Sequence, residues 1–336
     1  MKTYLEACKV PTVRIGDVEV PRLIAGLHPF DGYGYVSAEK DRANAEHFSE
    51  FQRIVDVLSY LAEEGITFTQ TDHMEGHLNR QHLVAIWKAS LRTGIEIGTL
   101  PFLVVPVTLD GKLLDSRRVH ATFDKNAYDR FGKAYREHLT GDPIIQYLGR
   151  RYGDAEGFLV QFERVPCYTQ AEIDRMEIDY ALLESYVGFF DGFDRLIADP
   201  GAEVDLLAPG GRLDLIEAYI AFLRRRFRAV VTSVHHPGVT IPILEKHNVG
   251  FDGYVTPLNK LGVFMLPTPE SALEAIRNSA RPVIAIKPMA GGRLLGREAF
   301  DYVLNQVGVS ACMFGVGRLD EVKFTVSEAR KAIGQG

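Results

Sequence analysis

The chain has 336 residues, of which 46% are hydrophobic and 24% are charged, and its formal net charge is −6. This composition supports one large folded core or two smaller ones, and the negative charge excludes the broad basic surface that nucleic-acid binding requires. No apolar run reaches the roughly 18 residues needed to cross a bilayer, so no membrane partner is expected. The three cysteines are too far apart for a zinc ribbon or a disulfide framework, and the first residues carry no long apolar region, so we expect a cytoplasmic protein.

The first predicted unit is a buried strand that ends in a glycine-rich loop. The segment "PRLIAGLHPFDGYG" (21–34) supplies the apolar run, and its loop carries His28 and Asp31. A helix is predicted over 47–65, because its apolar residues recur on one face. These residues are Phe51, Ile54, Val55, Leu58 and Leu61. Gly65 is placed to end this helix, as a C-terminal glycine does.

The same strand-then-helix order continues along the chain. "ITFTQTDH" (66–73) is the second predicted strand and "IEIGTLPFLVVPV" (95–107) contains the third. Further strands are predicted within 203–211, 229–238, 251–260, 281–292 and 309–317, with helices between them. The apolar runs are continuous rather than alternating, which is typical of parallel strands covered on both faces.

Eight strands, most of them followed by a helix, predict an α/β fold of the (β/α)8 TIM barrel type. A doubly wound open sheet is the alternative, but no GxGxxG motif opens the first helix. We expect a single domain over 1–336 with a long insertion after the third strand, at 110–199. This insertion is expected to form a lid or a pocket wall. A surface decoration or a contact in a homo-oligomer remains an alternative, and "GFLVQFERV" (157–165) could instead be a barrel strand.

Candidate catalytic side chains gather where the predicted strands end. His28, Asp72, His77, His236 and Lys287 each follow or end a strand, and the carboxyl ends of barrel strands form one face. Imidazole and carboxylate groups there are suited to acid–base catalysis on a small-molecule substrate, with lysine stabilising negative charge.

A divalent metal site is the alternative use of these residues, because imidazole and carboxylate together bind metals with an open position. The candidate ligands are His28, Asp72, His73 and His236. The four-residue spacing of His73 and His77 is a weak signal, since Gly76 disfavours a regular helix between them.

The last strand carries a separate signal for an anion. "FGVGRLDEVK" (314–323) combines a strand, a glycine turn and a helix start, where free N–H groups attract phosphate. Gly315, Gly317 and Arg318 are the expected contacts, and Gly291 of "KPMAGGRL" would add a second wall. An empty glycine turn is the simpler alternative.

Several of these segments resemble the aldo-keto reductases, outside roughly 110–200. "VPRLIAGLHPF" is similar to the opening strand of that family, and "EEGITFTQTDHMEGH" to the passage that ends in its catalytic aspartate. "FDGYVTPLN", "RPVIAIKPMAGGRL" and "GVSACMFGVGRLDEVKFTVSEA" resemble its last three units. The resemblance implies a (β/α)8 barrel with NADP(H) along the last two strands.

The resemblance also implies site residues, although the match is incomplete. The catalytic aspartate falls on Asp72, whereas the catalytic tyrosine falls near His77 and the catalytic lysine near Pro106. The family's catalytic histidine falls in "LLAPGG" (206–211), which has none. The expected coenzyme contacts are His235, Lys287, Gly291, Gly315, Gly317 and Arg318.

Three functions follow as hypotheses. The first is an oxidoreductase that uses NADP(H) on a small polar or sugar-like carbonyl or alcohol, with His77 or Lys287 in place of the missing tyrosine. The second is a lyase, isomerase or epimerase that uses acid–base groups or a metal without nicotinamide. The third is a barrel that binds a ligand without catalysis.

Overall fold

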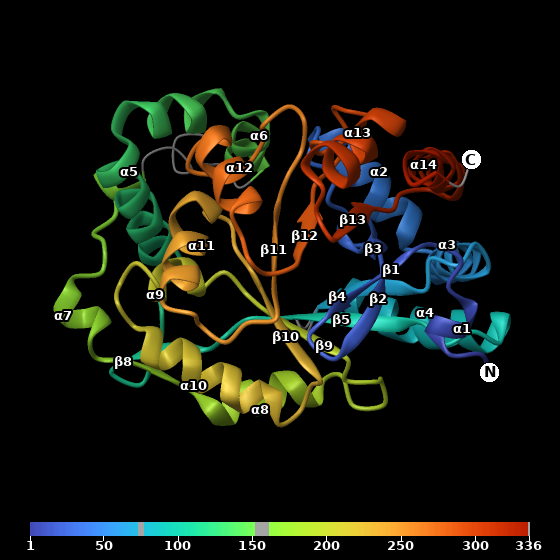
Figure 1. Cartoon of the computed structure of the whole chain (residues 1–336), viewed down its shortest axis with the longest axis horizontal. Coiled ribbons are helices and arrows are strands. Elements are labelled where there is room, and N and C mark those ends of the chain that lie inside the picture. Colours follow the sequence, from blue (N-terminus) through green and yellow to red (C-terminus); the bar gives the residue numbers. More distant parts are fainter. Residues whose placement is uncertain (73–76, 152–160, 335–336) are drawn as a thin grey trace.

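The fold is that of a computed structural model, which describes residues 1–72, 77–151 and 161–334. Its centre is a closed barrel of eight parallel strands (Figure 1). In barrel order these are β3 (Leu23–Gly26), β4 (Phe68–Asp72), β5 (Gly98–Leu103), β9 (Ile197–Pro200), β10 (Ala229–Ser233), β11 (Gly253–Pro257), β12 (Val283–Ile286) and β13 (Ala311–Gly315). The predicted (β/α)8 TIM barrel is confirmed, and the open doubly wound sheet is wrong, because β13 pairs with β3 and closes the cylinder.

Helices lie between the strands and cover the barrel from outside. They are α2 (Ala38–Phe48), α3 (Phe51–Glu63), α4 (His77–Thr93), α8 (Tyr180–Gly188), α9 (Val204–Leu207), α10 (Leu213–Arg224), α11 (Pro237–Lys246), α12 (Pro269–Arg277), α13 (Arg297–Asp301), η3 (Tyr302–Val307) and α14 (Leu319–Ala332). Helix α3 confirms the helix that the apolar periodicity predicts, because Ile54, Val55, Leu58 and Leu61 are all buried. Gly65 follows this helix with φ +78°, a conformation that favours glycine.

The amino end of the barrel is closed by a hairpin that precedes the first barrel strand. Its strands are β1 (Thr12–Ile15) and β2 (Val18–Pro21), and the short helix α1 (Tyr4–Ala7) lies before them. Ile15, Val18 and Val20 are fully buried in the cluster that fills the barrel interior. With this end closed, a ligand has access only from the carboxyl ends of the strands.

The side-chain alternation of the strands makes the carboxyl end of the interior polar. In β10, Ala229 and Val231 belong to the interior cluster, so Ser233 points inward one step higher. The same two-residue period places Asp199 above Ile197 in β9. The barrel is therefore apolar at its base and polar beneath its open rim.

The segment between β5 and β9 forms a structure of its own. It contains β6 (Val107–Leu109), β7 (Lys112–Leu113), α5 (Ser116–Gly141), α6 (Pro143–Arg151), η2 (Gln161–Glu163), α7 (Gln170–Ile173) and β8 (Met176–Ile178). The three strands form a small antiparallel sheet, and α5 contacts α9 at one side of the barrel (Figure 1). The predicted boundary at 199 is too late, because Ile197–Pro200 is the fourth barrel strand.

Two further sequence predictions are corrected here. The segment 203–211 was expected to be a strand, but it contains the helix α9. The described part of "GFLVQFERV" includes the 3₁₀ turn η2 and supplies no barrel strand. No helix in the described part of the chain is long and apolar enough to cross a membrane.

Candidate functional site

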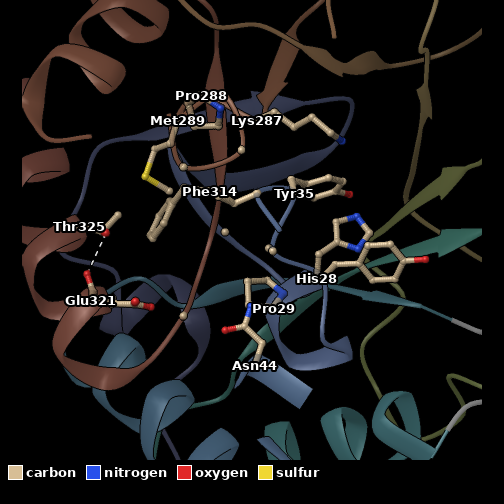
Figure 2. A pocket seen from close by; sticks show the side chains of 18 of the residues that line it. His28, Pro29, Tyr35, Asn44, Lys287, Pro288, Met289, Phe314, Glu321 and Thr325 are labelled. Atoms are coloured by element: carbon tan, nitrogen blue, oxygen red, sulfur yellow. Dashed lines mark hydrogen bonds between the residues drawn. The ribbon is translucent and has the colours of Figure 1, made fainter. Parts of the chain in front are cut away.

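A cavity of about 480 Å³ opens at the carboxyl ends of β12, β13 and β3. Of the predicted site residues, it is lined by His28, Lys287, Gly291, Gly315 and Gly317. Figure 2 shows Lys287, Tyr35 and His28 at one end of this cavity and Glu321 and Thr325 at the other, with Phe314 and Met289 between them. The cavity therefore joins the predicted catalytic lysine to the predicted anion-binding turn.

Lys287 lies directly after β12, and its ammonium group faces two aromatic rings. Its Nζ is 5.0 Å from the ring centroid of Tyr35 and 5.1 Å from that of Phe264. Burial lowers the pKa of Lys287 from 10.5 to about 8, and the negative charge of Asp142 partly opposes this shift. At neutral pH the group is mainly cationic, with a fraction of neutral amine.

His28 begins the turn η1 (His28–Asp31), which follows β3. Its ring lies 5.7 Å from that of Tyr33 and 5.6 Å from that of Tyr35, measured between centroids. The surrounding protein and then the charge of Lys287 lower the pKa of His28 below 6.5. The side chain is open to the cavity, and the lowered pKa keeps its imidazole neutral at pH 7.

Two carboxylates meet below His28, where η1 approaches the end of β4. Burial and then the charge of Asp72 raise the pKa of Asp31 from 3.8 to about 7. The Asp31 Oδ1 atom is buried and has no hydrogen-bond partner in the described part of the chain. Asp72 does not line the cavity itself, although Gln70 of the same strand does. Near neutral pH, one member of this pair holds a proton.

The turn after β10, which carries two of the predicted histidines, is held by a buried carboxylate. The Asp205 carboxylate accepts hydrogen bonds from the N–H groups of His235, at 2.7 Å, and His236, at 3.3 Å, and from the Thr240 hydroxyl. Neither histidine lines the cavity, but the charges of Lys287 and His28 both act on the pKa of His235. His235 instead packs edge-on against Phe264, with centroids 5.9 Å apart.

His236 is buried against the insertion rather than beside the other candidate residues. The Tyr135 hydroxyl of α5 donates to Asp124 and lies 3.5 Å from His236 Nε2. Burial lowers the pKa of His236 from 6.5 to about 3, and its Nδ1 atom has no partner among the described residues. We interpret His236 as a link between α5 and the barrel.

The insertion also supports the cavity wall from behind, although it contributes no cavity-lining residue in the described ranges. The Tyr147 hydroxyl of α6 donates to Asp41, and the other oxygen of Asp41 accepts from the Gly34 N–H at 2.7 Å. Asp142 accepts from the Phe264 N–H. These contacts fix the loops that carry Tyr35 and Phe264.

The predicted anion turn is occupied by a carboxylate of the chain itself. Glu321 accepts from the Arg318 N–H at 3.1 Å, and it forms an ion pair of 2.6 Å with Lys40. Arg318 does not line the cavity, whereas Gly315 and Gly317 do. A phosphate at this helix end would have to replace the Glu321 carboxylate.

Two predicted histidines cannot be placed by side chain. His73 lies outside the described residues, and for His77 only the backbone is described, as the first residue of α4. Within the described ranges, no group of three or more His, Cys, Asp or Glu side chains is arranged to hold a metal. The metal alternative therefore has no geometric support from His28, Asp72 or His236.

Three residues at the carboxyl end of the barrel were not identified from the sequence. Tyr35 and Phe264 form the faces around Lys287, and Asp199 is a fully buried acid beneath the rim. The aromatic content of "HPFDGYGY" was a usable signal for Tyr35, but nothing local marks Phe264. Asp199 could have been found only by recognising "IADP" as a strand.

Comparison with known proteins supports the fold. No family model matches the sequence, and a search of curated proteins found no match. Two solved structures from Pseudomonas aeruginosa, each described as a "putative aldo-keto reductase", are similar. The first has a TM-score of 0.54 at 13% identity and covers 96% of each chain. The second has a TM-score of 0.52 at 15% identity and covers 96% of this chain and 95% of its own. At these identities the likeness supports the (β/α)8 barrel fold.

Proposed function

We propose that this barrel is an oxidoreductase that uses a nicotinamide coenzyme, NADP(H), on a small polar carbonyl or alcohol substrate. The observation that carries the proposal is the shape of the cavity, which runs from Lys287 to the start of α14 along walls rich in glycine. Gly315 is open to the cavity, and a Cβ there would meet only Pro29, at 3.8 Å. Such a wall lets a ligand approach the backbone closely.

The residues present fit a nicotinamide coenzyme along most of this wall. Gly291, Gly315 and Gly317 would hold it through the backbone, and it supplies a hydride to the carbonyl carbon when bound. The fit is poorer at the start of α14, where Glu321 takes the Arg318 N–H. Coenzyme binding there would require that carboxylate to move or to contact a hydroxyl group.

Lys287 is suited to the proton transfer that accompanies carbonyl reduction. A pKa of about 8 keeps most of the ammonium protonated at pH 7 and close enough to neutrality to donate efficiently. In this role it replaces the tyrosine that the sequence lacks near His77. The pair of Asp31 and Asp72 would then return a proton to the site from the β4 side.

A lyase or isomerase of the same fold is the second candidate. The neutral imidazole of His28 and the proton-holding pair of Asp31 and Asp72 favour it, because they provide acid–base groups without any coenzyme. Coenzyme binding distinguishes the two functions.

The experiment is a calorimetric titration of the protein with NADPH and with NADH. Gly315→Leu fills the cavity wall in open space and is expected to weaken binding at least tenfold. Gly141→Leu is the matched control, since Gly141 also has open space and lies outside the cavity lining. Failure of both coenzymes to bind the wild-type protein would reject the oxidoreductase and leave the second candidate.

A further inference from the structure

The backbone around Lys287 is held in an unusual conformation at three positions. Lys287, Tyr35 and Phe264 have φ values of +55°, +55° and +58°, in the left-handed region that side chains other than glycine rarely adopt. Each such residue costs conformational energy, and clusters of them occur at functional sites. The fold therefore maintains strain at the lysine and at both rings that face it.

The charge environment of Lys287 is also unusual for a lysine. In the described part of the chain its Nζ makes no hydrogen bond and no ion pair. Asp142, the acid that acts on its pKa, already accepts from the N–H groups of Ile144, Ile145 and Phe264. The amine thus faces two aromatic rings and lines a cavity, and no carboxylate of the described residues is paired with its Nζ.

We infer that Lys287 captures small aldehydes and ketones as a Schiff base, an activity beyond hydride transfer. The Nζ lone pair forms a bond to the carbonyl carbon, and the electrons of the C=O double bond pass to oxygen, which takes up a proton. The carbon–oxygen bond then breaks and water leaves, so that amine and carbonyl give imine and water with no oxidant or reductant. Protonation of the imine gives an iminium cation.

The neighbouring residues supply what these steps need. His28, which packs on Tyr35 beside the lysine, is a neutral imidazole that accepts the proton released by Nζ and returns it to the departing hydroxyl. The iminium keeps the positive charge of the lysine. The faces of Tyr35 and Phe264 therefore stabilise the product as they stabilise the ammonium.

Preferential alkylation of Lys287 tests the inference directly. The protein is treated near pH 7 with propionaldehyde and sodium cyanoborohydride, which reduces imines to stable alkylamines, and the modified lysines are identified by peptide mass spectrometry. A lysine with a pKa of about 8 is about 10% neutral at pH 7, against about 0.03% for one at the ordinary value of 10.5. Lower basicity also reduces nucleophilicity, so the rate advantage should be smaller than the ratio of these neutral fractions. We expect Lys287 to react at least tenfold faster than other lysines.

Lys323 is the matched control, because it also faces a ring, at 5.7 Å from the Tyr60 centroid, but is exposed. Equal rates at Lys287 and Lys323 in the wild-type protein would overturn the inference, and this comparison needs no variant. Lys287→Arg keeps the positive charge and cannot form an imine, so the fast modification at position 287 should be lost.

The outcome is independent of the proposed oxidoreductase function. Imine capture requires no coenzyme, and the NADPH titration requires no amine at position 287. A protein that binds NADPH but shows no fast alkylation would retain the oxidoreductase and lose the Schiff base. Fast alkylation without coenzyme binding would give the reverse result.

Discussion

Replacing Asp199 by asparagine should stabilise the protein by an amount that grows with pH. Asp199 is fully buried inside the barrel, where its Oδ2 accepts from the Ser233 hydroxyl at 2.9 Å and its Oδ1 has no partner in the described ranges. Burial raises the pKa of this carboxyl from 3.8 to about 8. Asparagine has the same shape and is neutral at every pH, so it keeps the Ser233 contact without the titration.

The size of the effect follows from the two pKa values. Between pH 3.8 and pH 8 the folded protein holds a proton on Asp199 that the unfolded chain releases, so the wild-type free energy of unfolding falls as pH rises. The loss is about 1.4 kcal/mol per pH unit, or about 4 kcal/mol at pH 7. The difference between Asp199→Asn and wild type should be close to zero near pH 4 and should level off above pH 8.

Urea unfolding followed by circular dichroism, repeated from about pH 4 to about pH 8, measures this difference. Asp129→Asn is the control, because Asp129 is an exposed acid paired with Lys125 on α5, and its effect should stay within about 0.5 kcal/mol. If the Asp199→Asn and wild-type proteins show the same pH dependence, Asp199 is ionised in the fold and the reasoning fails. Confirmation would mean that the chain retains a destabilising acid inside its barrel, as functional sites often do.

Two other variants test the geometry of the site. Asp205→Ala should lower the free energy of unfolding by about 2–4 kcal/mol, because the Thr240 hydroxyl and the N–H groups of His235 and His236 lose their acceptor. A loss below about 1 kcal/mol in urea unfolding would show that the turn after β10 is stable without this carboxylate. Glu321→Gln should raise the affinity for NADPH severalfold in calorimetry, because it removes a negative charge from the start of α14. Unchanged or weaker affinity would mean that phosphate does not bind there.

The fold could be predicted largely because parallel barrel strands are buried on both faces. Their apolar runs stand out in the sequence, as in "AVVTS", where every residue of Ala229–Ser233 is buried. The fourth strand is also buried, but its sequence did not predict a strand. Ile197–Pro200 is only four residues long and contains an aspartate and a proline, so it lacks the composition of a strand. Its position is fixed by pairing with β5 and β10, which no local signal carries.

The sequence could predict which residues lie at the strand ends, but not which of them come together at the cavity. Lys287 and His28 reach the cavity because each lies within two residues of the end of a barrel strand. His236 follows a strand too, but Asp205 takes its N–H group and its ring packs into the insertion. Which way a loop turns depends on distant acceptors, and these become visible only in the structure. Phe264 illustrates the same limit, since it reaches Lys287 through a left-handed backbone.

Buried acids and buried histidines should together give this protein a stability maximum on the acid side of neutrality. Burial raises the pKa values of four acids to about 7 or 8: Asp31, Asp199, Glu203 and Asp205. Burial also lowers the pKa values of six histidines, most strongly those of His28, His82, His235 and His236. The acids cost stability as pH rises above about 4, whereas the histidines cost stability as pH falls below 6.5. The two slopes oppose each other from about pH 4 to pH 6.5, and His28 contributes less to this balance because it is open to the cavity. Above pH 6.5 only the acids act, so the free energy of unfolding should fall towards pH 8. A steady rise over that interval in urea unfolding would show that these acids are ionised in the folded protein.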